Sequence, residues 1–153
     1  MIRIATRSDI PQVVELIVEF LQADTAYRQH IQQINREHLY KLAYQVIHTG
    51  YIWLLFNGPV AVGLLAAVKE ANMWIPHQVS LREIVWYVRE EYRKTIGAGR
   101  LFINFCQTGD ALIAAGQIFG YFTTRMTSTE DYDLLRRGFR VTETLYIRDQ
   151  GEQ

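Results

Sequence analysis

Two glycines in the middle of the chain, at the start of a helix-like segment, could bind a phosphate. Gly97 and Gly99 follow the polar run 89–95 and open an apolar stretch. Glycines at a helix N-terminus let an anion approach the backbone, where free N–H groups and the helix dipole bind it. The spacing therefore predicts a pyrophosphate site, and an ordinary turn whose glycines only make room is an equal alternative. Positive charge is added nearby by Arg93, Lys94 and Arg100.

One carboxylate interrupts the apolar run that precedes this polar stretch. Residues 81–88 are mostly apolar and β-prone, as expected of a strand covered on both faces, and Glu83 stands among them. Burial disfavours the ionised form, so we expect a pKa of Glu83 raised towards neutrality, which suits a general base. A structural carboxylate paired with Arg82 or another cation is the alternative, and the sequence leaves both open.

The elements that would position these residues follow from hydrophobic periodicity. Helices are predicted from Asp9 to about Gln22, from Asn35 to Gly50, from Gly97 to about Ala115 and, as a short segment, from residues 127–129 to Gly138. Strands are predicted at residues 2–5, 51–56, 60–68, 81–88, 117–124 and 141–147, with a loop at 69–78. This order, β-α-α-β-β-β-α-β-α-β, is typical of an α/β fold whose mixed sheet has helices on both faces.

Glycines refine this outline at four places. Asn57-Gly58 is a two-residue hairpin signal, and Gly50 has the place of a C′ residue that ends a helix. Gly63, inside a central strand, indicates that another backbone approaches closely. Gly109 predicts a bend or break in its helix, because glycine costs about 1 kcal/mol relative to alanine there.

The composition predicts one domain, residues 1–150, in a cytoplasmic protein. Of 153 residues, 49% are hydrophobic, which excludes a disordered chain. The formal net charge is zero, which argues against a general nucleic-acid binder. The only cysteine is Cys106, so no intrachain disulfide can form, and an inert thiol is expected because its surroundings are apolar. No signal peptide or membrane-length apolar run is visible.

Several other kinds of site are disfavoured by the residues present. Phe102 stands where a dinucleotide-binding fingerprint needs its third glycine, and no GK[ST] follows as a Walker loop requires. The four histidines are scattered without ligand spacing, so no metal is expected.

The order of elements and three motifs resemble the GCN5-related N-acetyltransferase (GNAT) family over nearly the whole chain. Glu83–Phe102 resembles its acetyl-CoA motif, in which a hydrophobic strand is followed by E-Y-R and K-x-x-G-x-G. Residues 134–139 are similar to the closing L-Y-x-x-L-G-F segment, and residues 2–9 to the opening I-R-x-A-x-x-x-D. Tyr27-Arg28 after the first helix is similar to a compact branch common in bacteriophages and prophages.

The resemblance implies a central sheet of about six to seven strands, whose fourth and fifth strands splay apart to hold acetyl-CoA as co-substrate. Glu83 matches the glutamate base of the histone-acetylating branch, and Tyr132 is a weaker candidate for a general acid. The implied acetyl-CoA contacts are Tyr87, Val88, Arg93, Lys94, Thr95, Ile96, Gly97, Ala98, Gly99 and Arg100.

The chain departs from the family pattern at the closing segment. Leu134 stands in place of the tyrosine, and Tyr132 lies two residues earlier, on roughly the opposite face of a helix. Thr127 stands near the usual position of an asparagine. These departures weaken the catalytic assignment and keep a second hypothesis open, a catalytically degenerate binding or phage accessory protein.

The first hypothesis is an acyl-CoA N-acyltransferase that transfers an acetyl group to a primary amine by direct attack in a ternary complex. The acceptor, a small molecule or a protein amine, cannot be read from the sequence. Neither nucleic acid nor a membrane is expected as a partner, and homodimerisation is left open. If the gene belongs to a phage, the host cytoplasm is the expected location.

Overall fold

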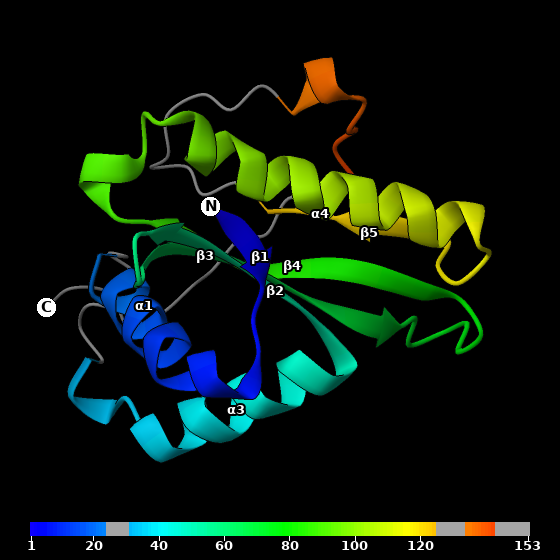
Figure 1. Ribbon diagram of the computed structural model, residues 1–153. Coiled ribbons are helices and arrows are strands. Elements are labelled where there is room, and N and C mark those ends of the chain that lie inside the picture. Colours follow the sequence, from blue (N-terminus) through cyan, green and yellow to red (C-terminus); the bar gives the residue numbers. More distant parts are fainter. Residues whose placement is uncertain (24–30, 125–133, 143–153) are drawn as a thin grey trace, which may run out of the picture.

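The computed structural model describes residues 1–23, 31–124 and 134–142, in which one mixed sheet has helices on both faces (Figure 1). Its strands lie in sequence order: β1 (Ile2–Ile4), β2 (Gly50–Asn57), β3 (Val60–Ala71), β4 (Val79–Val88) and β5 (Gly120–Phe122). Neighbouring strands are antiparallel up to β4, and β5 runs parallel to β4.

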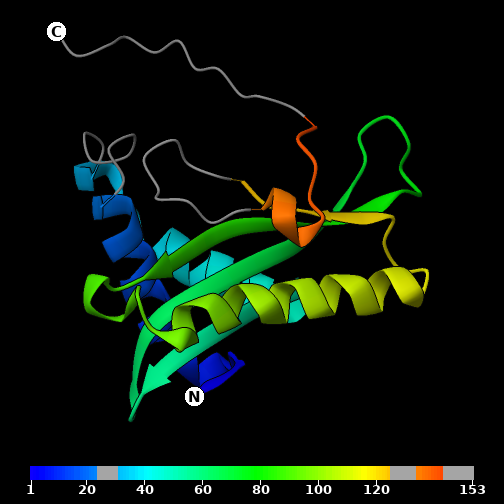
Figure 2. The same cartoon turned by 90° about the horizontal axis from the view of Figure 1, so that it is seen from above.

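The described residues form three long helices, α1 (Ile10–Ala23), α3 (Arg36–Thr49) and α4 (Ile96–Ala114). Figure 2 shows α4 on one side of the sheet, with α1 and α3 on the other. Short 3-10 turns lie between these elements, at Arg7–Asp9, Ile31–Gln33, Glu90–Tyr92 and Leu135–Arg137. None of the helices in the described ranges is long and apolar enough to cross a membrane.

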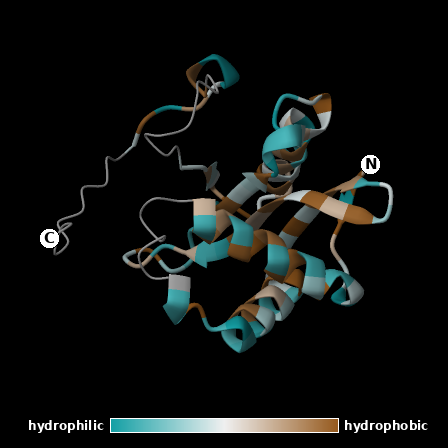
Figure 3. Cartoon of the chain, turned by 90° about the vertical axis from the view of Figure 1, so that its left-hand side faces the viewer, coloured by the Kyte–Doolittle hydropathy of each residue, from teal (hydrophilic) through white to brown (hydrophobic). Residues whose placement is uncertain are grey.

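Two apolar layers form because successive strand residues face opposite sides of the sheet. Leu54 and Leu64 face α1 and α3, whereas Leu65 and Leu81 face α4. Phe102 and Phe105 of α4 are fully buried against the second face. Apolar segments gather in the strands, while the helices alternate apolar and polar residues (Figure 3). The predicted α/β fold with helices on both faces is confirmed.

The number and length of the strands differ from the expectation. The described residues form five strands rather than six to seven. The strand predicted at 117–124 is paired only at Gly120–Phe122, and Val141 and Thr142 have no strand structure, while 143–147 lie outside the described residues. The loop predicted at 69–78 is shorter, because Lys69, Glu70 and Ala71 continue β3 by pairing with β4. Met73 and Trp74 in the remaining loop are more than four-fifths exposed, so their side chains do not return to the core.

The glycine predictions were right in part. A Cβ at Gly63 would lie 3.1 Å from the Tyr87 carbonyl oxygen, so the expected close approach of a second backbone is confirmed. Gly50 does not adopt the left-handed conformation of a C′ glycine (φ −137°). Its missing side chain is required because a Cβ would overlap the Ala67 carbonyl oxygen. Gly109 does not break α4, which is continuous from Ile96 to Ala114. Its missing side chain makes room for the ring of Tyr121, which a Cβ would overlap.

Candidate active site

Glu83 lies where β4 and β5 stop pairing. The last β4–β5 pair is Arg82 with Phe122, and β5 ends there while β4 continues to Val88. The Glu83 side chain is buried, with 6% of its residue surface exposed. Its Oε2 accepts a hydrogen bond from the Thr123 hydroxyl at 3.0 Å and one from the Thr124 N–H at 3.2 Å. Beyond the last backbone pair of β4 and β5, the Glu83 carboxylate therefore connects β4 to the residues that follow β5.

The environment of Glu83 raises its pKa. Burial is the largest cause, and hydrogen bonds from Thr124 and Thr123 to the ionised form partly offset it. Arg82, the predicted structural partner, instead binds Glu70 with Nε to Oε2 at 2.6 Å and lies over the Phe122 ring. Within the described ranges no cation neutralises Glu83, so its carboxyl group holds a proton more readily than an exposed glutamate does.

A β-bulge follows directly after Glu83. Ala67 pairs with Glu83 and Ala66 pairs with Val85, which leaves Ile84 as an extra residue on β4. Such a bulge bends its strand and re-aims the neighbouring side chains.

The end of β4 offers backbone groups on the side away from β3. The Arg89 N–H donates to the Val62 carbonyl oxygen of β3 at 3.0 Å. Because backbone direction alternates along a strand, the N–H and C=O of Val88 point to the opposite side. The Val88 carbonyl oxygen accepts a hydrogen bond from Arg93 Nε at 2.9 Å on that side. In the described part of the chain no strand pairs with β4 there beyond Arg82.

The N-terminus of α4 follows after one 3-10 turn and has no side-chain cap. Thr95 is in the cap position, but its hydroxyl donates to the Tyr92 carbonyl oxygen at 2.7 Å. The Ala98 N–H binds the Thr95 carbonyl oxygen, which leaves the N–H groups of Ile96 and Gly97 without an acceptor in the described residues. Unsatisfied N–H groups at a helix N-terminus are the groups that bind anions.

The two glycines of the predicted pyrophosphate site, Gly97 and Gly99, have different surroundings. A Cβ at Gly97 would lie 2.8 Å from Leu55 Cδ1, so this glycine packs against the sheet. Gly99 faces open space, where a Cβ would meet nothing within 4 Å. Arg93, Lys94 and Arg100 are all exposed around this turn. Gly99 is therefore the position at which a ligand can come close to the helix without moving the core.

An ion pair that periodicity did not reveal joins α1 to the end of β4. Arg89 donates from Nε and Nη2 to the two carboxylate oxygens of Glu19, at 2.9 and 2.7 Å. Tyr87 lies beside this pair, and burial together with Glu19 raises its pKa. Thr123 and Thr124 were also missed. The available signal was that both directly follow a predicted strand that could pair in parallel with β4.

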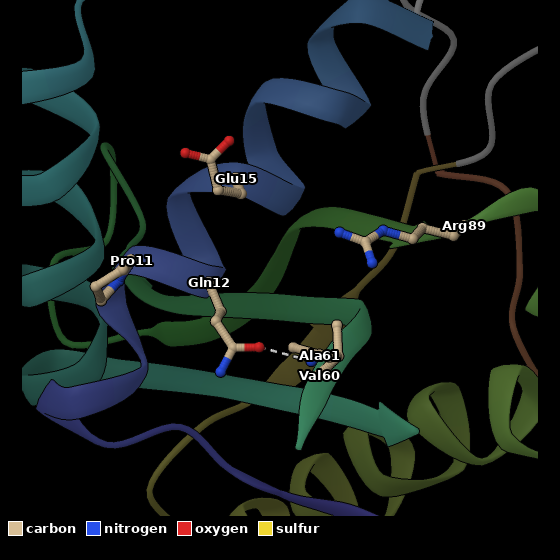
Figure 4. Close-up of a pocket in the computed structure, with 6 residues that line it drawn as sticks. All are labelled: Pro11, Gln12, Glu15, Val60, Ala61 and Arg89. Atoms are coloured by element: carbon tan, nitrogen blue, oxygen red, sulfur yellow. Dashed lines mark hydrogen bonds between the residues drawn. The ribbon is translucent and has the colours of Figure 1, made fainter. Parts of the chain in front are cut away.

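A shallow hollow of about 230 Å³ lies between α1 and the β2–β3 hairpin (Figure 4). Gln12 on its wall accepts a hydrogen bond from the Ala61 N–H at 2.7 Å. Its charged residues are already paired, Glu15 with Arg36 and Arg89 with Glu19. The hollow contains neither Glu83 nor the α4 N-terminus, so it adds no reactive group to the site.

Two predicted features lie beyond what the structure describes. Tyr132 and Thr127 fall in the range 125–133, and Tyr27-Arg28 in the range 24–30. Leu134, which stands in place of the family's tyrosine, packs against the α4 face of the core. The remaining predicted residues lie along one path, from Glu83 through the end of β4 to the first turn of α4.

No protein-family model and no curated protein matches this chain. Solved structures do. A Trypanosoma brucei acetyltransferase matches with a TM-score of 0.70 and 14% identity, over 97% of this chain and 98% of its own. A GNAT family acetyltransferase from Staphylococcus aureus matches with a TM-score of 0.65 and 16% identity, over 97% of each chain. An aminoglycoside acetyltransferase from an uncultured soil metagenomic sample, in complex with sisomicin, matches with a TM-score of 0.65 and 16% identity, over 100% of this chain and 95% of its own. At these identities the likeness is one of fold, and the expected GNAT-like fold is confirmed.

Proposed function

We propose that this protein is an acetyl-CoA-dependent N-acetyltransferase that acts on a primary amine. The observation that carries the proposal is the buried Glu83, without a cation in the described residues, at the point where β4 and β5 separate. The GNAT fold supports the same class of reaction. An exposed or ion-paired carboxylate at this position would not support a general-base reaction of this class.

The residues along the path fit the parts of acetyl-CoA. The backbone of Val88, on the unpaired side of β4, suits an amide-containing arm, with Tyr87 beside it as a further proposed contact, and the Val88 N–H suits a developing oxyanion. The uncapped N–H groups at the start of α4 suit the pyrophosphate. The proposed contacts there are Arg93, Lys94, Thr95, Ile96, Gly97, Ala98, Gly99 and Arg100. Acetyl-CoA would supply an acyl carbon activated as a thioester.

Glu83 would act as the general base. An alkylammonium group has no lone pair, so it must lose a proton before its nitrogen can attack. Burial raises the pKa of Glu83 and makes the carboxylate a better proton acceptor than an exposed glutamate. The proton would pass from the ammonium nitrogen to Glu83 and then to water. A thiol leaving group with a pKa near 8.5 needs no general acid at neutral pH, so Tyr132 is not essential to the proposal.

A second candidate is a binding protein that keeps the fold without turnover. The specific observation in its favour is Leu134, which has an apolar side chain packed on the core where the family has a hydroxyl group. Acetyl-CoA binding combined with no transfer to any amine would favour this candidate over the first.

Thermal stability should respond to acetyl-CoA and not to unrelated nucleotides. A ligand that binds only the folded state raises Tm with increasing concentration. We expect this for acetyl-CoA, and little change with NAD or ATP at equal concentration, measured by differential scanning fluorimetry. A larger shift with NAD would contradict the proposal. Mass spectrometry with sisomicin, a lysine-containing peptide and a peptide with a free N-terminus would then identify the class of acceptor.

Gly99→Asp should weaken acetyl-CoA binding by at least tenfold, or about 1.4 kcal/mol. The substitution places a negative charge beside the proposed pyrophosphate site, in open space where the fold tolerates a side chain. Gly99→Asn is the matched control, because it has the same size without the charge and should lose less affinity. Gly97 is unsuitable for this test, since a side chain there would collide with Leu55. Unchanged affinity in folded Gly99→Asp, measured by calorimetry, would place the site elsewhere.

A further inference from the structure

The Glu83 carboxylate is held by donors from the two residues that directly follow β5. The Thr123 hydroxyl and the Thr124 N–H both donate to Oε2, at 3.0 and 3.2 Å. The Thr124 hydroxyl is a third hydrogen-bonding group beside this carboxylate. Oε2 is thus held in place by two donors from consecutive residues.

The two donors are held by the short strand that precedes them. Tyr121 of β5 donates from its hydroxyl to Asp110 Oδ1 of α4 at 3.0 Å, and its ring packs edge-on to Phe105. Phe122 pairs with Arg82 in the ladder. Thr123 and Thr124 follow directly, so their donors are anchored to both β4 and α4 at the place where Glu83 needs them.

We propose that Thr123 is a positioning residue for Glu83: the Thr123 hydroxyl, together with the Thr124 N–H, fixes Oε2 and so orients the carboxylate that takes the proton from the acceptor. The inference rests on the proposed function and adds to it a residue outside the family motif. Proton transfer moves one proton from the ammonium nitrogen to the Glu83 carboxylate, leaves a neutral amine and a neutral Glu83, and is completed when Glu83 passes that proton to water.

The hydrogen bonds also set when Glu83 is ionised. Ala67 pairs with Glu83 on the β3 side and is apolar, and Arg82, which is adjacent to Glu83 in the chain, binds Glu70. No charged group on a described element contributes to the raised pKa of Glu83. The donors at Thr123 and Thr124 are therefore the groups that favour the carboxylate against the effect of burial.

The test is the pKa of Glu83 in Thr123→Val and Thr123→Ser. The valine variant keeps the shape and removes the donor, so the Glu83 pKa should rise by up to about one unit, because hydrogen bonds to ionised groups are among the stronger ones. The serine variant keeps a hydroxyl and should stay near the parent protein. Carboxyl ¹³C NMR titration of Glu83 in the free protein measures this without any substrate.

Activity supplies the second readout, with acetyl-CoA and whichever of sisomicin, the lysine peptide or the N-terminal peptide is acetylated fastest. In Thr123→Val the acidic limb of the kcat/KM profile should move to higher pH by the shift seen in the titration. A one-unit shift means a tenfold loss at a pH below the limb and nearly full recovery above it. Loosened structure alone would instead lower the rate at every pH.

The two readouts separate the possible failures. A Glu83 pKa that is unchanged or lowered in Thr123→Val overturns the inference, even if the enzyme is active. An unchanged pKa means that the hydroxyl does not act on Glu83, and a lowered pKa means that water has entered a loosened site. An equal shift in Thr123→Ser also overturns it, since the hydroxyl would then be irrelevant. A parent protein that acetylates none of the three acceptors overturns the proposed function and the catalytic part of this inference, whatever the titration shows.

Discussion

Replacing Glu83 with glutamine is expected to lower kcat at neutral pH by about a hundredfold or more, the usual contribution of a positioned general base. Glutamine has the same shape, and its side-chain oxygen can accept the hydrogen bonds from Thr123 and Thr124 that Oε2 accepts now. The arrangement of β4 and β5 should therefore persist, and the Kd for acetyl-CoA should change little. Raising the pH should restore part of the rate, because more of the acceptor amine is then already deprotonated.

The stability of Glu83→Gln gives an independent check. Because the Glu83 pKa is raised in the folded state, the folded protein binds this proton more tightly than the unfolded chain. The parent protein should lose stability as the pH rises from the ordinary glutamate pKa through the raised one, and the glutamine variant should lack this loss. Urea unfolding at a series of pH values measures the difference.

A matched carboxylate on the neighbouring strand provides the control for the rate. Glu70→Gln removes an exposed carboxylate that binds Arg82, and exposed pairs contribute little, so kcat should stay near that of the parent protein. Near-normal kcat in Glu83→Gln, together with a lowered Tm at neutral pH, would reject the base and leave Glu83 as a structural carboxylate.

Gly109→Ala should destabilise the protein by about 1–3 kcal/mol, the usual cost of overfilling a packed site. The added Cβ would overlap the Tyr121 ring. That ring cannot easily move, because it meets Phe105 and Phe139 edge-on with centroids 5.4 Å apart in each case, and its hydroxyl binds Asp110. Alanine favours a helix by about 1 kcal/mol over glycine, which offsets only part of the cost. Urea unfolding followed by circular dichroism measures the change.

The same substitution elsewhere in α4 should have the opposite sign. Gly99 faces open space, so Gly99→Ala adds no collision and should gain up to about 1 kcal/mol from helix propensity. A loss of stability at both positions, or at neither, would show that the Tyr121 contact does not decide the role of Gly109.

Much of the fold could be predicted from local patterns. The α1, α3 and α4 helices and the strands β2, β3 and β4 follow periods of about 3.6 and 2 residues, which depend only on which face of an element is buried. A two-residue turn joins β2 to β3 as expected, but its residues are Gly58 and Pro59 rather than Asn57 and Gly58, because Asn57 still pairs with Val60 in the ladder. Gly58 has a positive φ of 57°. The length of β5 was overestimated, because its backbone pairing with β4 ends at Phe122 and the next residues, Thr123 and Thr124, bind the Glu83 side chain instead.

The candidate site was likewise predictable only in the parts that depend on local sequence. By itself, the sequence determined that Glu83 would be buried in an apolar strand and that a glycine-rich helix start would follow. Both depend on residues adjacent in the chain. Only the tertiary structure decided that Thr123 and Thr124 hold Glu83, that Arg82 binds Glu70, and that Gly99 rather than Gly97 faces open space. These facts depend on contacts between residues 12 to 42 positions apart, and such contacts leave no periodic signal in the sequence.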